Sequence, residues 1–360
     1  MKDSFGREID YMRVSVTERC NLRCRYCRSP FDTDMPIHEA GQNRPFRTTD
    51  HESTGDPLSC DEILRIIRIT TKLGIRHIRL TGGEPLLREG IEGLIRSIRS
   101  INGIETVTMT TNGILLEEKL PELVREGLAG VNVSLDTTDE EKYCRITGVS
   151  SDEGKKYIGT IFRGIDAALA AGLRVGINCV LNRGPGSDDI ADWRGLAEIA
   201  RDRKVSVRFI EIMPIGCGKN YKGVPNTELM EMMREQYPGM KPERNPETAA
   251  GSSDAQKPGG NGPAVYYIIP GFEGSIGFIS AISDRFCSRC NRIRLTSRGG
   301  LKPCLCYGEQ TELSGLLRSG ADDDTILHTI EKTILSKPLE HHFEAPEMIT
   351  EKREMSGIGG

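Results

Sequence analysis

Six apolar, β-branched runs alternate with helix-like segments over the first 214 residues. Between the runs, apolar residues recur at helical spacing, as Ile63, Ile66 and Ile67 do. Ser59 and Glu62 form the capping-box pattern that starts such a helix. Strands that alternate with helices predict a parallel sheet, and six units are too few for a closed (β/α)8 barrel. We therefore predict an α/β fold, a partial (β/α)6 TIM-like barrel, with strands over residues 12–17, 77–82, 106–112, 130–136, 174–181 and 206–214.

Two polar segments interrupt this pattern and indicate how the chain divides. Residues 31–57 are irregular, and residues 245–263 read NPETAAGSSDAQKPGGNGP, which is typical of a flexible loop. The 360 residues also exceed the roughly 250–300 at which single cores stop growing. We predict a barrel core over residues 1–240, a C-terminal α+β region over 241–345 and a tail over 346–360.

Composition narrows the class of protein. A formal net charge of −4 argues against a general nucleic-acid binder, so we expect no nucleic-acid partner. The sequence has no run of 18 apolar residues and no N-terminal signal segment, which predicts a cytoplasmic protein without a membrane partner. Eleven cysteines in 360 residues are too few for a secreted disulfide scaffold. In a reducing compartment, clustered cysteines more often bind metal or take part in chemistry.

Cys20, Cys24 and Cys27 form a C-x3-C-x2-C cluster shortly after the first strand. Three thiolates within eight residues suit an iron–sulfur cluster. A [4Fe–4S] cluster usually has four cysteine ligands, so three would leave one iron open to another molecule. The alternative is structural, because the same spacing would place three small apolar residues on one face of a helix.

A second group of cysteines, Cys287, Cys290 and Cys304, is followed closely by Cys306. Four thiolates could form a closed structural zinc site. The residues around them favour a different kind of site, because residues 285–302 include six arginines or lysines and no acid. The group therefore combines metal-binding thiols with a strong local positive charge.

Alternation along the strand that follows places Cys290, Arg292 and Arg294 on one face. Guanidinium groups bind phosphate through paired hydrogen bonds. We therefore predict that thiols and arginines face one anionic ligand, with a solvated surface as the alternative for the arginines.

Five sequence blocks resemble known families. CNLRCRYC at 20–27, TGGEP at 81–85 and VNVSLD at 131–136 resemble the radical S-adenosylmethionine (SAM) superfamily. FCSRCNRIRLTSRGGLKPCL at 286–305 and MSGIGG at 355–360 resemble the GTP 3′,8-cyclase (MoaA) family of molybdenum cofactor biosynthesis. That resemblance implies a partial radical SAM barrel with a C-terminal region that carries a second [4Fe–4S] cluster.

The resemblance further implies a lyase reaction that uses SAM. Cys20, Cys24 and Cys27 would hold the first [4Fe–4S] cluster, whose open iron binds SAM. Reductive cleavage of SAM would give a 5′-deoxyadenosyl radical that takes hydrogen from C3′ of GTP. The carbon radical would then attack guanine C8, and uptake of one electron and one proton by the resulting radical would yield 3′,8-cyclo-7,8-dihydro-GTP. The implied SAM-contacting residues are Tyr26, Gly83, Ser134 and Met213.

The second cluster would be held by Cys287, Cys290 and Cys304, and its open iron would bind GTP. The terminal Gly359 and Gly360 would enter the active site and be needed for cyclisation. The implied partners are GTP, an electron donor and a cyclic pyranopterin monophosphate synthase that uses the product, and a homodimer is allowed. The implied GTP-binding residues are Arg13, Arg79, Thr110, Arg292, Ile293 and Arg294.

Three positions, Gly176, His77 and Cys306, depart from the family pattern. Gly176 replaces a lysine of the GTP site, and Arg174 on the same strand face is our candidate substitute. His77 stands where a lysine is common and is expected to be neutral at pH 7. Cys306 has no counterpart. Two alternatives therefore stay open: a radical SAM enzyme that acts on another nucleotide or a peptide, and a non-catalytic binding protein stabilised by zinc.

Overall fold

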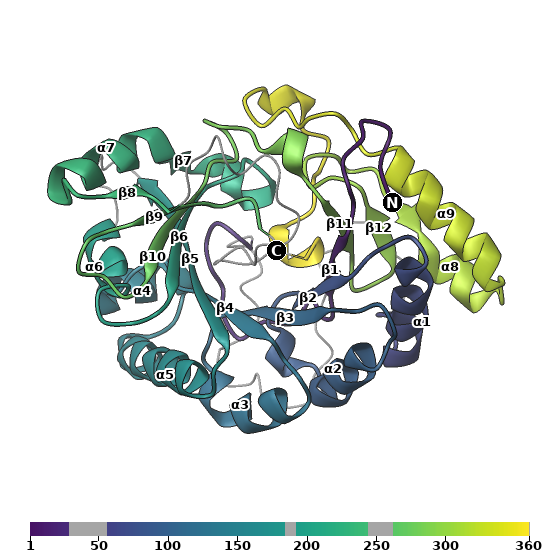
Figure 1. The fold of residues 1–360 in the computed structure, drawn as a ribbon, viewed down its shortest axis with the longest axis horizontal. Coiled ribbons are helices and arrows are strands. Elements are labelled where there is room, and N and C mark those ends of the chain that lie inside the picture. Colours follow the sequence, from purple (N-terminus) through teal and green to yellow (C-terminus); the bar gives the residue numbers. More distant parts are fainter. Residues whose placement is uncertain (29–55, 184–191, 244–261, 360) are drawn as a thin grey trace.

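The computed structural model describes residues 1–28, 56–183, 192–243 and 262–359. Six parallel strands form its centre in the order of the chain, and every predicted strand is confirmed. They curve into an open ring (Figure 1). Their bounds are β1 Tyr11–Ser15, β2 His77–Thr81, β3 Thr106–Thr111, β4 Gly130–Ser134, β5 Arg174–Arg183 and β6 Ser206–Glu211.

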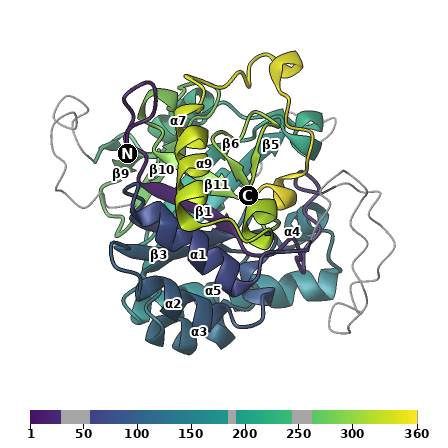
Figure 2. The ribbon, with the colours of Figure 1, turned by 90° about the vertical axis from the view of Figure 1, so that its right-hand side faces the viewer.

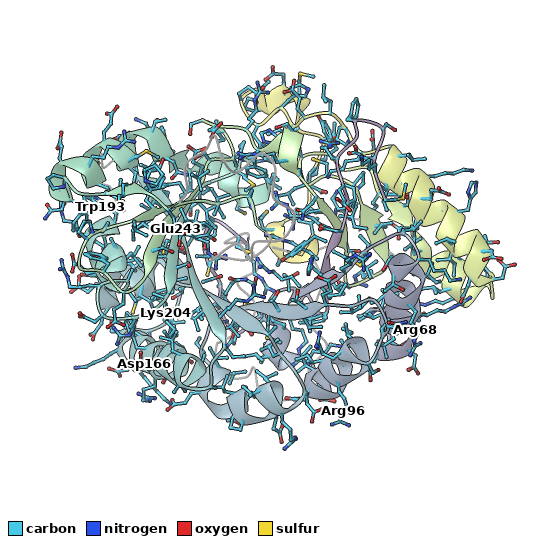
Figure 3. The ribbon with its side chains drawn as sticks, viewed as in Figure 1. Arg68, Arg96, Asp166, Trp193, Lys204 and Glu243 are labelled. Carbon is cyan, nitrogen blue, oxygen red and sulfur yellow. The ribbon has the colours of Figure 1, made fainter. Side chains whose placement is uncertain are left out.

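Helices cover the outer face of this ring (Figure 1). The predicted capping box is present, since Ser59 Oγ accepts from the Glu62 amide at 3.1 Å and Glu62 Oε2 from the Ser59 amide at 2.7 Å. Ile63 and Ile66 are fully buried, whereas Arg68 and Arg96 point away from the strands (Figure 3). The helices are α1 Cys60–Thr71, α2 Ile91–Arg99, α3 Leu116–Arg125, α4 Glu140–Thr147, α5 Ser151–Ala170 and α6 Trp193–Glu198.

The chain after residue 240 extends both edges of the same sheet. β10 (Ser275–Ile279) pairs in parallel with β6, and β11 (Arg292–Leu295) pairs in parallel with β1. Outside them lie β9 (Val265–Ile268) and β12 (Gly300–Lys302), both antiparallel to their inner neighbours. The division near residue 240 stays a prediction, because the two parts share one sheet. The remaining strands are β7 Lys222–Gly223, β8 Lys241–Pro242 and β13 Thr311–Glu312.

The other α-helices of the described residues are α7 (Asn226–Gln236), which ends before residue 240, and α8 (Leu313–Arg318) and α9 (Asp323–Leu335), which follow it. α9 packs beside α1 (Figure 2). Most buried apolar side chains form one core between the sheet and the helices, and a second, smaller apolar cluster includes Ile358 of the tail. Short 3-10 helices cover Pro85–Leu87, Gly216–Asn220, Cys287–Arg289, Pro346–Met348 and Met355–Gly357. Over the described ranges, every helix is too short or too polar to span a membrane.

Candidate active site

The two cysteine triads lie at opposite ends of the sheet. Cys20, Cys24 and Cys27 follow β1, so they lie beyond the carboxyl ends of the parallel strands. Cys290 directly precedes β11, which runs parallel to β1. The second triad therefore lies at the amino-terminal ends of the strands. Cys304 reaches that end because β12 runs antiparallel to β11.

The first triad lies in a loop rather than on a helix, so the helical alternative is wrong. Arg23 and Arg25 tie this loop to α4 through their amides, which donate to Thr147 O at 2.9 Å and Ile146 O at 3.0 Å. A turn closed by the Cys27 amide on Cys24 O, at 2.9 Å, brings the last two thiols together.

The donor set of the first triad fits a cationic iron–sulfur cluster. Burial, with the charge of Cys20, raises the pKa of Cys27 to about 12. Burial and the neighbouring thiols Cys27 and Cys20 raise the pKa of Cys24 well above its usual range. Thiolates at these three half-buried positions would repel one another, so a bound cation would stabilise them together.

The glycines of the TGGEP motif allow the first-triad loop to pack against β2. A Cβ atom on Gly82 would lie 2.3 Å from Thr17 O, and one on Gly83 would lie 2.3 Å from Arg19 O. From the sequence, we predicted that these glycines let the backbone approach a ligand. In the structure they also let it approach the backbone of Thr17 and Arg19. Glu84 holds the strand ends together by accepting from the Asn112 amide and from Thr111 Oγ1, both at 2.7 Å.

The predicted SAM residues gather near the same end of the sheet. Tyr26 donates from its hydroxyl to Asp136 Oδ2 at 2.6 Å, just beyond Ser134 at the end of β4. Burial raises the pKa of Asp136 to about 6. Met213 follows β6 and packs against the small apolar cluster that contains Ile358. The structure thus brings the first triad and these predicted SAM contacts to one end of the barrel.

The second triad is held by backbone contacts from distant segments. Arg7 Nη1 donates to Cys287 O at 3.0 Å, and the Cys290 amide donates to the same oxygen at 3.1 Å. Burial would raise the pKa of Cys290, but the positive charges of Arg292 and Lys337 outweigh it and lower that pKa to about 6. Cys290 is therefore readily available as a thiolate ligand, which fits an iron–sulfur cluster.

Cys306 lies next to the second triad and is fully buried. Burial raises its pKa to about 11, and the charges of Cys304 and Cys287 act in the same direction. Burial raises the pKa of Cys287 as well, whereas Cys290 favours the thiolate. The prediction that Cys306 is not a cluster ligand therefore rests on the family pattern.

Four cations stand side by side across neighbouring strands between the two triads. Arg13 on β1 is in register with Arg79 on β2 and Arg294 on β11, and Arg294 is in register with Lys302 on β12. Arg79, Arg294 and Lys302 are buried. Burial, then the charges of Arg294 and Arg292, lowers the pKa of Arg13 well below its usual range. Arg13, Arg79 and Arg294 repel one another, so a polyanion would stabilise them together, whereas Lys302 is already paired with Glu351.

Arg208 on β6 is a further cation that the sequence analysis missed. Its guanidinium fills the space above Gly176, because a Cβ atom there would lie 1.5 Å from Arg208 Nη2. Gly277 on the other flank gives room for the stem, since a Cβ atom there would lie 2.8 Å from Arg208 Cγ. Nη2 also donates to Asn132 Oδ1. The sequence does contain a signal for this cation, because Arg208 is an arginine inside the apolar run 206–214.

The expected substitute for the missing lysine, Arg174, is exposed at the amino-terminal end of β5. It lines the same cavity as Arg208, so this interpretation stays a prediction, but the guanidinium that occupies the space at position 176 is that of Arg208. His77 is half-buried and its Nδ1 lies 2.9 Å from Thr106 Oγ1. Burial lowers its pKa, which agrees with the predicted neutral form at pH 7.

A cavity of about 1030 Å³ opens at the amino-terminal ends of the strands. Arg79, Arg208 and Gly176 line its inner wall, and Asp166 and Lys204 lie at its edge (Figure 3). The cavity is large enough for a nucleotide-sized ligand. Arg79 and Arg208 thus connect the cationic row to an open space.

The C-terminal tail enters the ring of strands, where it ends at the centre of the view (Figure 1). Gly359 O accepts from Arg294 Nη1 at 3.0 Å and from Thr81 Oγ1 at 3.2 Å. Ile358 is fully buried, and Gly359 has a φ of +78°, which favours glycine. Gly360 lies outside the described residues. The remaining predicted GTP residues, Thr110 and Ile293, lie on β3 and β11, where Ile293 is buried.

Comparison with known proteins decides the family. Residues 14–197 match the Radical SAM superfamily, and residues 205–343 match Molybdenum Cofactor Synthesis C. The chain is 40% identical to GTP 3′,8-cyclases of Clostridium perfringens (strain 13 / Type A) and Pelotomaculum thermopropionicum, with all of both chains covered. The chain belongs to the GTP 3′,8-cyclase family. This family lies within the radical SAM superfamily, whose members use SAM and a [4Fe–4S] cluster.

A solved structure shares the fold of this chain. The crystal structure of Streptococcus suis SuiB bound to S-adenosylmethionine has a TM-score of 0.51 and covers 97% of this chain and 75% of that one, at 14% identity. The predicted radical SAM barrel is thereby confirmed. Membership of the GTP 3′,8-cyclase family argues against the zinc-stabilised, non-catalytic alternative.

Proposed function

We propose that this protein is a GTP 3′,8-cyclase, a lyase that converts GTP to 3′,8-cyclo-7,8-dihydro-GTP with SAM as radical source. The observation that carries the proposal is the row of Arg294, Arg13 and Arg79, in register on three neighbouring strands between two cysteine triads. In a protein similar along its whole length to GTP 3′,8-cyclases, this row suits the triphosphate of GTP.

Cys20, Cys24 and Cys27 would hold the first [4Fe–4S] cluster. When bound and reduced, this cluster supplies the electron that cleaves SAM to a 5′-deoxyadenosyl radical. Tyr26, fixed by its hydrogen bond to Asp136, would line the SAM site together with Gly83, Ser134 and Met213. These contacts lie at the carboxyl ends of the strands, where barrels of this type bind their substrates.

GTP would lie between the two triads. Arg13, Arg79 and Arg294 would bind the phosphates, and Arg208 would supply the charge that the family's lysine gives elsewhere. Each guanidinium–phosphate contact at about 4 Å is worth roughly 4 kcal/mol at an effective dielectric constant near 20, before desolvation. Thr110 would contact GTP from β3.

At the other end of GTP, Cys287, Cys290 and Cys304 would hold the second [4Fe–4S] cluster. Arg292, Ile293 and Arg294 continue from this triad along β11, so they would contact the same ligand. The backbone of Gly359 and Gly360 would reach the active site through the tail. Residues at both ends of the strands would thereby fix the position of GTP relative to SAM.

The cell supplies the other partners of this reaction. An electron donor reduces the first cluster, and a cyclic pyranopterin monophosphate synthase uses the product. None of the eleven cysteines, all of which lie in the described part of the chain, forms a disulfide, and this suits the cytoplasm.

The test is an anaerobic reaction with SAM, a reductant and GTP deuterated at C3′. We expect a cyclised nucleotide that separates from GTP by chromatography, and 5′-deoxyadenosine that carries the deuterium. The label reports the abstraction step directly, since the cyclised nucleotide is an isomer of GTP. Unlabelled 5′-deoxyadenosine with no new nucleotide would reject GTP as substrate and favour the alternative, a radical SAM enzyme for another nucleotide or a peptide.

A further inference from the structure

A buried ion pair that the proposed chemistry does not use joins β12 to the C-terminal tail. Lys302 and Glu351 have side chains that are 0% and 1% exposed. Lys302 Nζ donates to the Glu351 carboxylate and to Tyr307 O, the latter at 2.6 Å. Removing two charges from water costs several kcal/mol for each ion, so such a pair is weak evidence for stability. A role in fixing one arrangement of the chain accounts for it better.

The surroundings of Glu351 show that its position is closely defined. Glu351 Oε1 accepts from the Arg353 amide at 2.9 Å and from Arg353 Nε at 3.0 Å. The Glu351 amide donates to Cys306 O at 3.3 Å. This residue is therefore tied to β12 through Lys302 and to the segment after Cys304 through its own backbone.

Lys302 stands directly beside Arg294 in the antiparallel pair of β11 and β12. Residues opposite each other in such a pair point to the same face of the sheet. Arg294 Nη1 donates to Gly359 O, and Lys302 Nζ donates to Glu351. Two neighbouring cations thus hold the tail at two points, one at its base and one at its end.

Between these two points the tail is packed rather than free. Met355 and Ile358 contact the small apolar cluster that includes Leu305. A shift of the tail by one residue would move Gly359 by about 3.3–3.6 Å, the length of one extended residue. That displacement exceeds a hydrogen-bond length, so Gly359 would lose Arg294 and Thr81. The position of Glu351 therefore sets where Gly359 lies.

We propose that Lys302 and Glu351 are positioning residues for the reaction, a clamp that sets the register of the tail so that its terminal glycines reach the active site. The inference rests on the proposed function, in which the tail takes part in GTP cyclisation. Because Cys304 follows Lys302 by two residues, the clamp also couples the tail to the second triad.

The test compares Glu351→Gln and Lys302→Met in the full-length chain with both clusters reconstituted. The readouts are hydrogen exchange of the amides of residues 355–359 and cyclised product formed per SAM cleaved. We expect exchange to become at least tenfold faster and product per SAM cleaved to fall at least tenfold. Iron content and SAM cleavage should stay within about twofold of the unmodified chain. Glu351→Asp, which keeps the charge on a shorter side chain, should lie in between.

Glu126→Gln is the matched control, because this carboxylate also binds two arginines, Arg96 and Arg125, but on the outer helices. It should leave both readouts unchanged. Unchanged tail exchange in both clamp variants would overturn the inference, and so would faster exchange with normal product per SAM cleaved. Loss of iron in both variants would overturn it too, by showing a structural role. If the unmodified chain forms no cyclised GTP, the proposed function fails, while tail exchange still decides whether the clamp exists.

Discussion

At the scale of single residues, Gly176 and Arg208 form a complementary pair. Arg208 Nη2 occupies the space in which a side chain at position 176 would begin. We expect Arg208→Ala to weaken GTP binding by roughly 1.5–3 kcal/mol, the range for hydrogen bonds to charged groups. Guanosine, which lacks phosphates, should lose less. Anaerobic titration calorimetry with both ligands measures the difference.

The same pair makes a second prediction at this scale. Gly176→Lys, which would tighten GTP binding if the site had room, should weaken it because the new side chain collides with Arg208. The double variant Gly176→Lys/Arg208→Ala should recover most of the affinity, since the lysine then has the space and supplies the charge. Arg174→Ala is the control and should change GTP binding less than Arg208→Ala. Tighter binding by the single Gly176→Lys variant would contradict our placement of Arg208.

At the scale of elements, the segment from β10 to β12 carries the second triad on short connections. Cys304→Ala should lower bound iron from about eight to about four per chain, since one four-iron cluster is lost and the other is kept. SAM cleavage should survive, because the first triad lies at the opposite end of the sheet. Iron analysis after anaerobic reconstitution measures this. Cys306→Ala is the control, and loss of iron in that variant would show that Cys306 is a ligand.

At the scale of the whole molecule, the tail connects the two ends of the active site. Its Ser356 amide donates to the Cys27 thiol, and Gly359 reaches Arg294. Removing Gly359 and Gly360 should leave folding, both clusters and SAM cleavage intact and abolish cyclised product. Ordering each tail residue costs about 1–2 kcal/mol, which the partly buried Met355 and the fully buried Ile358 help to offset. A truncated chain that cyclises GTP at the full rate would show that the tail is dispensable.

The sequence by itself determined the local elements and the chemistry of the ligands. Strand runs and the Ser59–Glu62 capping box are local patterns, so the six strands and the start of α1 were predicted correctly. Cysteine spacing and the resemblance to a family pointed to two metal-binding triads, which the structure places in two separate sites. These features depend on residues close together in the chain, so hydrophobic periodicity and residue spacing are enough to predict them.

Only the tertiary structure decided which distant residues share a site. Strand pairing aligned Arg13, Arg79 and Arg294, although they come from three strands far apart in sequence. The sequence interpretation chose Arg174 as the missing cation because it lies on the same strand as the glycine. The long side chain of Arg208 reaches from β6 to the space beside Gly176 on β5. A pattern within one strand cannot predict a contact between two strands. The contact between the tail and β12 is likewise tertiary, because Lys302 pairs with Glu351, 49 residues further along the chain. A buried charge is costly without a partner, and here the fold brings that partner from the tail.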